Sequence, residues 1–362
     1  MLRLKPVLVI GLGGSGKLGC KMLKKYFKER YKKDLLDPVT GLPPLVDILC
    51  IETDPGKEKE EKQLTLPDVD TIEAFINEKD FDVIQSDDYL NRNPEIKDWL
   101  AKPLPIGEIE GGAGQIRQAG RLAFWIHRKA REKIEKRISG KLTDLLSDHT
   151  IGEATRRNIQ LISRTIDVYI ITSICGGTGA GMLLDIAGLI KKYSRSSKIF
   201  LIGLLPGIFE QEIDISQSIQ RLYANAYATL KEINYFMRKN PWRVTYTVNE
   251  RRRHENVDIA GTNLFDYLFL VSEKSPNLHL VDRLHLSPLI ADFLYYNINF
   301  VGERLRSSRV NFDQYITPDH YCSSLGVAVL SFPLEEVLSI CSNTLGSEVT
   351  SLLNSGEYTS ED

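Results

Sequence analysis

This chain of 362 residues has no long hydrophobic run. Its longest apolar stretches, 199–205 and 264–271, fall well short of the roughly 20 residues that an α-helix needs to span a bilayer. The start of the chain also lacks the form of a secretory signal, because Arg3 and Lys5 lead into a short strand-like run that ends in glycines. These absences predict a protein without a membrane span, and we expect a cytoplasmic location.

Cysteine is scarce, and charge of one sign is not in excess. The five cysteines contain no Cys-x-x-Cys pair and have apolar neighbours, which predicts reduced core thiols rather than a disulfide framework or a zinc site. The net charge of −2 gives no bias toward nucleic acid. Basic stretches at 21–33 and 117–137 have the pattern of solvated helix faces, so nucleic acid is not an expected partner.

What the chain does contain is an alternation of strand-like and helix-like segments. Such alternation predicts an α/β fold with a mostly parallel sheet and helices on both faces. The expected strands are 7–10, 45–51, 168–174, 198–205, 267–271 and 325–332, and the expected helices are 15–32, 69–79, 94–101, 115–138, 180–193, 216–238, 288–308 and 334–353.

Two glycine clusters, Gly11–Gly16 and Gly176–Gly181, each directly follow an apolar, β-branched run and precede a helical stretch. Glycine lets backbone N–H groups approach a phosphate without an intervening Cβ, and the positive end of the following helix adds attraction. Two such turns in one chain predict a site that grips several phosphates from two sides.

The first cluster by itself fits three interpretations. It satisfies Gly-x-Gly-x-x-Gly, and Glu52 follows the second strand where a ribose-binding acid is expected, which favours an oxidoreductase that uses NAD(P) or FAD. It also fits the P-loop pattern up to Lys17, but Leu18 lacks the hydroxyl that would bind Mg²⁺. The third interpretation is a turn that only lets a helix pack close to its strand.

The second cluster carries a more specific resemblance. Cys175-Gly-Gly-Thr-Gly-Ala-Gly181 closely resembles the signature loop, GGGTGSG in its usual form, of the tubulin and FtsZ superfamily of GTPases. Three other segments resemble parts of the nucleotide site of that superfamily in the same order, namely Val9–Gly16, Cys50–Asp54 and Gly111–Gly120. The resemblance is collinear over 7–332, and the chain is identified as a bacterial tubulin-like protein.

This resemblance implies a Rossmann-like GTPase domain over 1–286 and a central helix over 287–308. The remainder, 309–362, would hold a catalytic-type loop, a strand and the beginning of a small second domain. Only about 30 residues follow the strand at 325–332, so we expect either a fragment or a reduced member. The polar insert at 241–262 fits neither tubulin nor FtsZ closely and predicts a hairpin at the sheet edge.

The resemblance also implies GTP or GDP with Mg²⁺ as cofactors. Asp54 would be an outer ligand of the Mg²⁺, which phosphate oxygens and water would mostly hold, and Thr178 would add a hydroxyl to the phosphates. The nucleotide-binding residues implied by the loops are Gly11, Gly13, Gly14, Ser15, Gly16, Lys17, Asp54, Gly112, Ala113, Gly114, Gly176, Gly177, Thr178, Gly179, Ala180 and Gly181.

Recognition of guanine in this superfamily uses an asparagine after the strand that is here 267–271, and an aromatic and an amide four residues apart on the central helix. Asn277, Tyr295 and Asn299 match that pattern, since a spacing of four places the last two on one helical face. The alternative is that these are ordinary residues at the edge of the core.

Hydrolysis in the superfamily occurs in trans, when a loop after the central helix brings an acid to the nucleotide of the next subunit. Val310-Asn-Phe-Asp313 resembles the core of that loop, which makes Asp313 and Asn311 the candidate catalytic residues. FtsZ carries a second aspartate three residues later, where this chain has Ile316. Alternatively, Asn311 and Asp313 only cap a turn.

Three functions therefore stand side by side. The first is a GTPase that self-associates head to tail into filaments. The second is a nucleotide-binding regulatory or scaffold module that does not polymerise, which Ile316 and the short C-terminal part favour. The third is the oxidoreductase that uses NAD(P) or FAD. Arg251-Arg-Arg253 in the insert would be the contact site for an unidentified protein partner.

Overall fold

The structure is a computed structural model, and it divides into two compact units, Met1–Leu325 and Gly326–Asp362. In the second unit it describes one helix, α13 (Leu334–Ser355). None of the described helices is long and apolar enough to cross a membrane. The described residues are 2–54, 65–74, 86–92, 94–97, 99–100, 113–126, 128–212, 216–247, 254–275, 278–279, 283–299, 322–325 and 334–355.

A seven-stranded sheet forms the centre of the first unit, in the order β13-β10-β7-β6-β2-β3-β4, and every neighbouring pair is parallel. The predicted α/β fold with a mostly parallel sheet is confirmed. Strand β2 is buried along its whole length, as expected for a strand with helices on both faces. The strands are β2 (Val7–Leu12), β3 (Val46–Glu52), β4 (Thr71–Glu73), β6 (Asp167–Ser173), β7 (Lys198–Leu204), β10 (Tyr267–Val271) and β13 (Cys322–Ser323).

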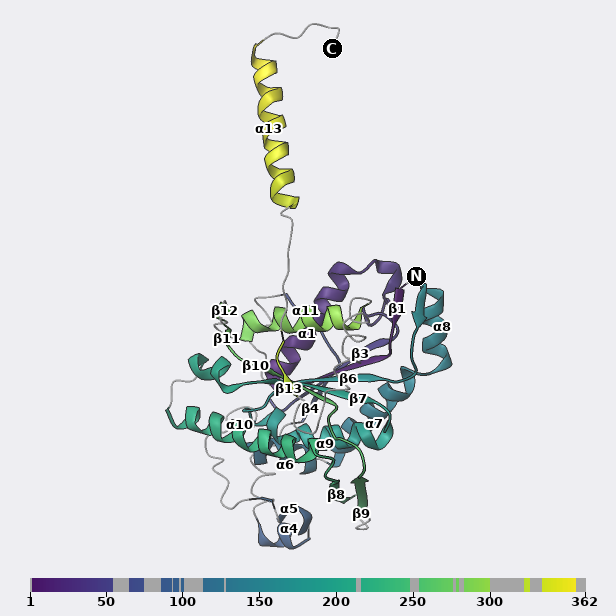
Figure 1. The fold of residues 1–362 in the computed structure, drawn as a ribbon, viewed down its shortest axis with the longest axis vertical. Helices are drawn as coiled ribbons and strands as arrows, with labels where there is room; N and C mark the ends of the chain where they lie inside the picture. Colours follow the sequence, from purple (N-terminus) through teal and green to yellow (C-terminus); the bar gives the residue numbers. More distant parts are fainter. Residues whose placement is uncertain are drawn as a thin grey trace. The chain divides into compact units, whose positions relative to one another are not determined.

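Helices cover the two faces of this sheet in separate layers (Figure 1). Helices α1 (Gly13–Arg30) and α11 (Arg283–Ile298) pack on each other over one face. The opposite face is covered by α6 (Arg117–Ile126), α7 (Arg128–Asp144), α9 (Thr178–Tyr193) and α10 (Ser216–Met237). Because α1 and α9 follow β2 and β6 directly, both begin at the carboxyl ends of the central strands.

Smaller elements surround this framework. Strands β1 and β5 pair in parallel, whereas β8 with β9 and β11 with β12 pair antiparallel. These elements are β1 (Leu2–Leu4), β5 (Ile159–Leu161), β8 (Trp242–Thr247), β9 (His254–Ile259), β11 (Lys274–Ser275), β12 (Leu278–His279), α4 (Asp87–Arg92), α5 (Pro94–Lys97), α8 (Asp148–Arg156), η1 (Lys33–Leu35) and η2 (Pro206–Glu212).

Several predicted elements differ in the structure. The helix expected at 69–79 is wrong at its start, because Thr71–Glu73 pairs with β3 as the edge strand β4. The helix expected at 115–138 is described as α6 and α7 on either side of residue 127, and α7 continues to Asp144, beyond the expected end. The central helix begins at Arg283, earlier than 287. Strand β13 lies at Cys322–Ser323, ahead of the expected 325–332, of which 326–332 is outside the described residues.

The insert does form a hairpin, but β8 and β9 make a sheet of their own rather than extending the central one. The hairpin packs on α9, where the Tyr246 hydroxyl donates a 2.8 Å hydrogen bond to Asp185. Trp242 lies against Gly188, where an added Cβ would meet the indole nitrogen at 2.4 Å. These aromatic side chains are also buried against α6 and α10, where Tyr246 packs on Phe124 and Trp125 and Trp242 packs on Phe236.

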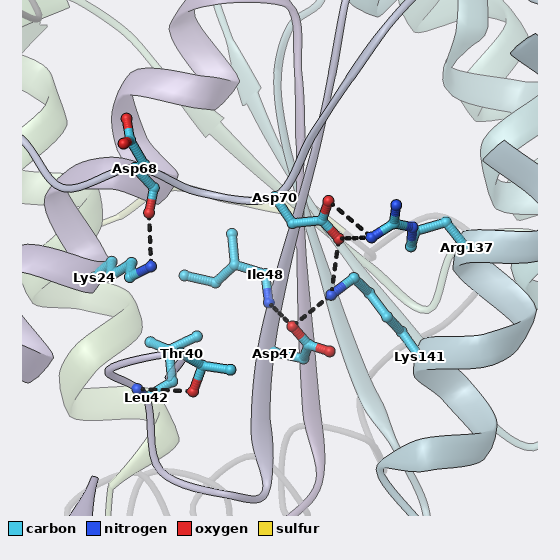
Figure 2. A network of polar contacts seen from close by, with 9 residues as sticks. All are labelled: Lys24, Thr40, Leu42, Asp47, Ile48, Asp68, Asp70, Arg137 and Lys141. Atoms are coloured by element: carbon cyan, nitrogen blue, oxygen red, sulfur yellow. Dashed lines mark hydrogen bonds and ion pairs between the residues drawn. The ribbon is translucent and has the colours of Figure 1, made fainter. Parts of the chain in front are cut away.

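The edge of the sheet at β4 is held by the ion pairs in Figure 2. Lys141 of α7 contacts Asp47 at 2.7 Å and Asp70 at 3.1 Å, and Arg137 contacts Asp70 at 2.9 Å. On the other side, Lys24 donates a 2.6 Å hydrogen bond to the Asp68 carbonyl. Partly exposed pairs of this kind contribute little stability each, but together they fix where the chain enters β4.

The basic stretch 117–137 is not simply a solvated face. Arg131 is 3% exposed, and Arg117 and Arg121 are partly buried against acids on other helices. Arg121 contacts Asp185 at 3.0 Å, and Arg117 pairs with Glu232. Charge patterning along one helix misses this because the partner carboxylates belong to α9 and α10.

Candidate functional site

The order in which successive strands are added to the sheet reverses between β2 and β6, which are parallel neighbours. From β2 the sheet grows outward through β3 and β4, and from β6 it grows the other way through β7, β10 and β13. The loops after β2 and β6 therefore diverge and leave a crevice at the carboxyl ends of the strands, the place where open α/β sheets bind ligands. Both predicted glycine clusters lie at this crevice.

A cavity of about 290 Å³ occupies the crevice, at the lower end of the range for ligand cavities. Helices α1 and α9 both begin at it, so two sets of unsatisfied N–H groups and two positive helix ends meet there. A guanidinium, that of Arg283 at the start of α11, also lines it. The lining residues are Leu12, Gly13, Gly14, Ser15, Gln115, Ser173, Gly176, Gly177, Thr178, Gly179, Phe209, Leu222 and Arg283.

Some glycines of the first cluster line the cavity, and others allow close packing of a helix on a strand. Gly13 has φ +72° and lies at the cavity, where an added Cβ would be 3.4 Å from the Thr178 Cβ, so the two clusters are in contact. Gly16 does not line the cavity, and its added Cβ would lie 2.4 Å from the Ile171 carbonyl oxygen. Gly16 therefore serves the close packing of α1 on β6.

The end of the second cluster also serves packing. An added Cβ at Gly181 would lie 2.3 Å from the Arg117 carbonyl oxygen, and the Arg117 guanidinium donates to the Ala180 carbonyl at 3.3 Å. Gly120 is equally close to the Gly177 carbonyl, at 2.1 Å for an added Cβ. Helices α6 and α9 cross through these glycines, which brings the loop before α6 to the cavity.

That loop presents Gln115 to the cavity. Gly114 and Gln115 both have positive φ, +50° and +61°, and Gln115 lines the cavity. Its Oε1 is buried and makes no hydrogen bond within the described part of the chain. On the outer side, Asn225 of α10 donates to the Gln115 carbonyl at 2.7 Å and to the Cys175 carbonyl at 2.9 Å.

The loop after β3 reaches the second cluster through a hydroxyl pair. The Thr53 and Thr178 hydroxyls are hydrogen-bonded to each other in a buried position. The Glu52 carboxylate accepts the backbone N–H groups of Thr53 at 2.8 Å and Asp54 at 3.1 Å, so it holds its own turn and is not among the cavity-lining residues. Asp54 is exposed and does not line the cavity either.

Cys175 replaces the first glycine of the signature loop as a neutral side chain. Burial raises the pKa of its thiol to about 12, so it carries no thiolate at neutral pH. The Ser173 hydroxyl accepts the backbone N–H of Gly176 at 3.1 Å and so closes the turn. Cys20 and Cys50 are buried as well, but Cys322 and Cys341 are exposed, which corrects the expectation of five core thiols.

With this geometry established, comparison with known proteins identifies the family. A family model described as "Tubulin like" matches residues 8–351. The chain belongs to this tubulin-like family. No curated protein matches it significantly.

Three solved structures are similar to this tubulin-like chain at low sequence identity. CetZ from Methanosaeta thermophila is 16% identical over 82% of the chain (TM-score 0.42). An FtsZ dimer from M. jannaschii is 15% identical over 82% (0.39), and TubZ of Clostridium botulinum phage c-st is 10% identical over 81% (0.35). The chain covers 54%, 56% and 59% of those chains, respectively.

The structure of the tubulin-like protein does not bring Tyr295 and Asn299 to the cavity. At 1.5 Å per residue, Tyr295 lies about 18 Å along α11 from Arg283. Its ring packs 5.6 Å from Phe27, and Asn299 accepts from the Tyr31 hydroxyl and donates to the Tyr295 carbonyl at 2.8 Å. Both side chains join the far ends of α1 and α11.

The other predicted residues that do not line the cavity lie in two groups. Lys17 lies in the first turn of α1, and neither it nor Gly11 or Ala113 is among the cavity-lining residues. Several of the residues named from the sequence lie outside the described residues, namely Gly112, Asn277, Asn311, Asp313, Ile316 and Arg251–Arg253. Prediction from sequence missed Gln115, Arg283 and Asn225; Gln115 directly follows Gly-Ala-Gly and so had a local signal, whereas the other two had none.

Proposed function

We propose that this tubulin-like protein binds GTP and GDP in the cavity between its two glycine clusters, and that it hydrolyses GTP on head-to-tail self-assembly in the cytoplasm. One observation carries the proposal: both clusters, Gln115 and Arg283 line a single cavity at the switch point of the sheet. Membership of the tubulin-like family supports a nucleotide as the ligand.

The lining residues fit a chain of phosphates. Backbone N–H groups at the starts of α1 and α9 would donate to phosphate oxygens, and Arg283 would add a positive charge. The Gln115 Oε1 is a buried hydrogen-bond acceptor without a partner in the described structure, so it would accept from an N–H or O–H group of the nucleotide and not from a phosphate oxygen. Thr178 would contribute its hydroxyl, which is hydrogen-bonded to the Thr53 hydroxyl.

Mg²⁺ would neutralise phosphate charge when bound. Among the described residues, no group of three or more His, Cys, Asp or Glu side chains is placed to hold a metal ion. This favours a Mg²⁺ held mainly by phosphate oxygens and water, the coordination the ion prefers. Asp54, one residue after Thr53, would be an outer ligand of this Mg²⁺.

Hydrolysis is proposed to use Asp313, with Asn311, from the next copy of the chain. The alternative is a module that binds the nucleotide without polymerising, which Ile316 favours because a second acid is replaced. The oxidoreductase has lost support, because Glu52, its candidate ribose acid, holds the turn at Thr53 and Asp54 instead.

Ligand-dependent thermal stability tests the nucleotide class. We expect GTP and GDP with Mg²⁺ to raise the unfolding temperature, because a ligand at 100 times its Kd stabilises the native state by about 2.7 kcal/mol. ATP and NAD at the same concentrations serve as matched controls. A shift with NAD but not with GTP would overturn the proposal and restore the oxidoreductase.

Replacing Arg283 by alanine should weaken GTP binding. Hydrogen bonds to charged groups contribute about 1.5–3 kcal/mol, so we expect Kd to rise by roughly 10- to 150-fold, with Arg283→Lys in between. Isothermal titration calorimetry measures this directly. The control is Arg30→Ala. Arg30 pairs with Asp292 at a distance of 2.6 Å and is not among the residues that line the cavity. Equal affinities of the Arg283→Ala and Arg30→Ala proteins would exclude Arg283 from the site.

A further inference from the structure

We infer that Asn225 of α10 is a positioning residue, which sets the separation of the second glycine cluster from the loop that carries Gln115. The inference rests on the proposed function of the cavity. Asn225 does not line the cavity itself. Its single side-chain amide nitrogen donates to the Gln115 carbonyl at 2.7 Å and to the Cys175 carbonyl at 2.9 Å.

These two bonds complete the restraint on two peptide groups. In the peptide after Cys175, the carbonyl is held by Asn225 and the N–H of Gly176 by the Ser173 hydroxyl at 3.1 Å. In the peptide after Gln115, the carbonyl is again held by Asn225, and the N–H of Ile116 donates to the Ala113 carbonyl at 2.7 Å. Each peptide is therefore held at both ends, so neither can rotate without breaking a hydrogen bond.

The restrained peptides adjoin ligand-facing groups. Gln115 has φ +61°, an unfavourable conformation for a residue with a side chain, and it needs surrounding restraint to persist. Gly176 and Gly177 follow Cys175 directly and line the cavity. The two loops are already close, since an added Cβ at Gly177 would lie 2.6 Å from the Ala113 Cβ. Asn225 thus fixes the position of the loop that carries Gln115 relative to the second glycine cluster.

Asn225 can make both bonds because its amide nitrogen carries two hydrogens. Aspartate has nearly the same shape, but its carboxylate would face two carbonyl oxygens and donate to neither. Serine donates once and is shorter. In contrast, Asn240 donates one similar bond, to the Tyr235 carbonyl at 2.7 Å, just after the far end of α10. Asn240→Asp therefore loses an amide-to-carbonyl bond without touching the cavity.

The test compares Asn225→Asp and Asn225→Ser with Asn240→Asp and the unmodified full chain. Titration calorimetry with a slowly hydrolysed GTP analogue and Mg²⁺ should show a Kd raised about tenfold for Asn225→Asp, as expected for the loss of one or two hydrogen bonds. Hydrogen exchange without nucleotide should accelerate at 113–116 and 174–178 and stay unchanged at 12–16. Asn240→Asp should match the unmodified chain in both measurements.

Two results would overturn the inference. One is an unchanged Kd in both Asn225 variants, and the other is exchange that rises equally across the whole sheet, which would indicate general destabilisation. If the Asn225→Asp protein does not fold, the Asn225→Ser protein is compared with Asn240→Asp in the same two measurements. Should the unmodified chain bind no guanine nucleotide, the proposed function fails, whereas exchange at the two loops still decides whether Asn225 restrains them.

Discussion

Replacement of Asp185 by alanine should lower the free energy of unfolding by about 3–5 kcal/mol, the usual cost of removing one member of a buried ion pair. Asp185 is fully buried on α9. Its carboxylate contacts Arg121 of α6 at 3.0 Å and accepts the Tyr246 hydroxyl of the hairpin at 2.8 Å. The Arg121 guanidinium faces the ring of Trp99 at 4.7 Å, so without Asp185 its charge stays in apolar surroundings.

This carboxylate joins three elements that the sequence keeps apart. Burial and the neighbouring carboxylate raise the pKa of Tyr246 well above its usual value, so the hydroxyl stays protonated and donates. Because α9 begins at the second glycine cluster, the hairpin insert is tied to the helix that forms the cavity. We therefore expect the insert to be an integral part of the fold.

Chemical denaturation of the full chain measures the effect. The matched control is Asp258→Ala, which removes an acid that pairs with Arg243 at 3.0 Å on the exposed side of the same hairpin. Exposed pairs contribute up to about 1 kcal/mol, so the control should unfold almost like the unmodified chain. Equal losses in the two variants would show that Asp185 does not join α6, α9 and the hairpin.

Replacement of Asp313 by alanine should reduce GTP hydrolysis by roughly 10²- to 10⁴-fold, the typical contribution of a positioned acid or base, with the affinity for GTP unchanged. In the proposed mechanism Asp313 acts on the nucleotide of the next copy, where it orients the attacking water. Head-to-tail contacts of this kind build open assemblies. Phosphate release per molecule should consequently rise with protein concentration.

Mixing two inactive variants gives a sharper test of hydrolysis in trans. An Arg283→Ala copy binds GTP poorly but keeps Asp313, and an Asp313→Ala copy binds GTP but lacks the acid. A mixture should therefore recover activity that neither variant shows alone. The control is Asp319→Ala, which removes a nearby acid outside the resemblance to the catalytic loop. Constant turnover per molecule on dilution, with no recovery in the mixture, would leave the non-polymerising module as the better function.

Local sequence patterns predicted most elements of the fold correctly. Strands β2, β3, β6, β7 and β10 and helices α1, α9 and α10 lie close to their expected positions, because apolar runs and helical periodicity act over a few residues. The misses have tertiary causes. The segment at Thr71–Glu73 is a strand only because β3 offers it an edge, and the pattern of Tyr295 and Asn299 serves the packing of α11 on α1.

By itself, the sequence determined that two turns of this protein can approach an anion, because the glycines and the helices that follow them are consecutive residues. It also determined the family resemblance, which depends on the order of those turns. Only the tertiary structure decided that the turns share one cavity, since this requires β2 and β6 to be neighbours. The same holds for Arg283 and Asn225, which reach the cavity loops through the packing of α11 and α10. Contacts between residues so far apart in the chain leave no local pattern to read.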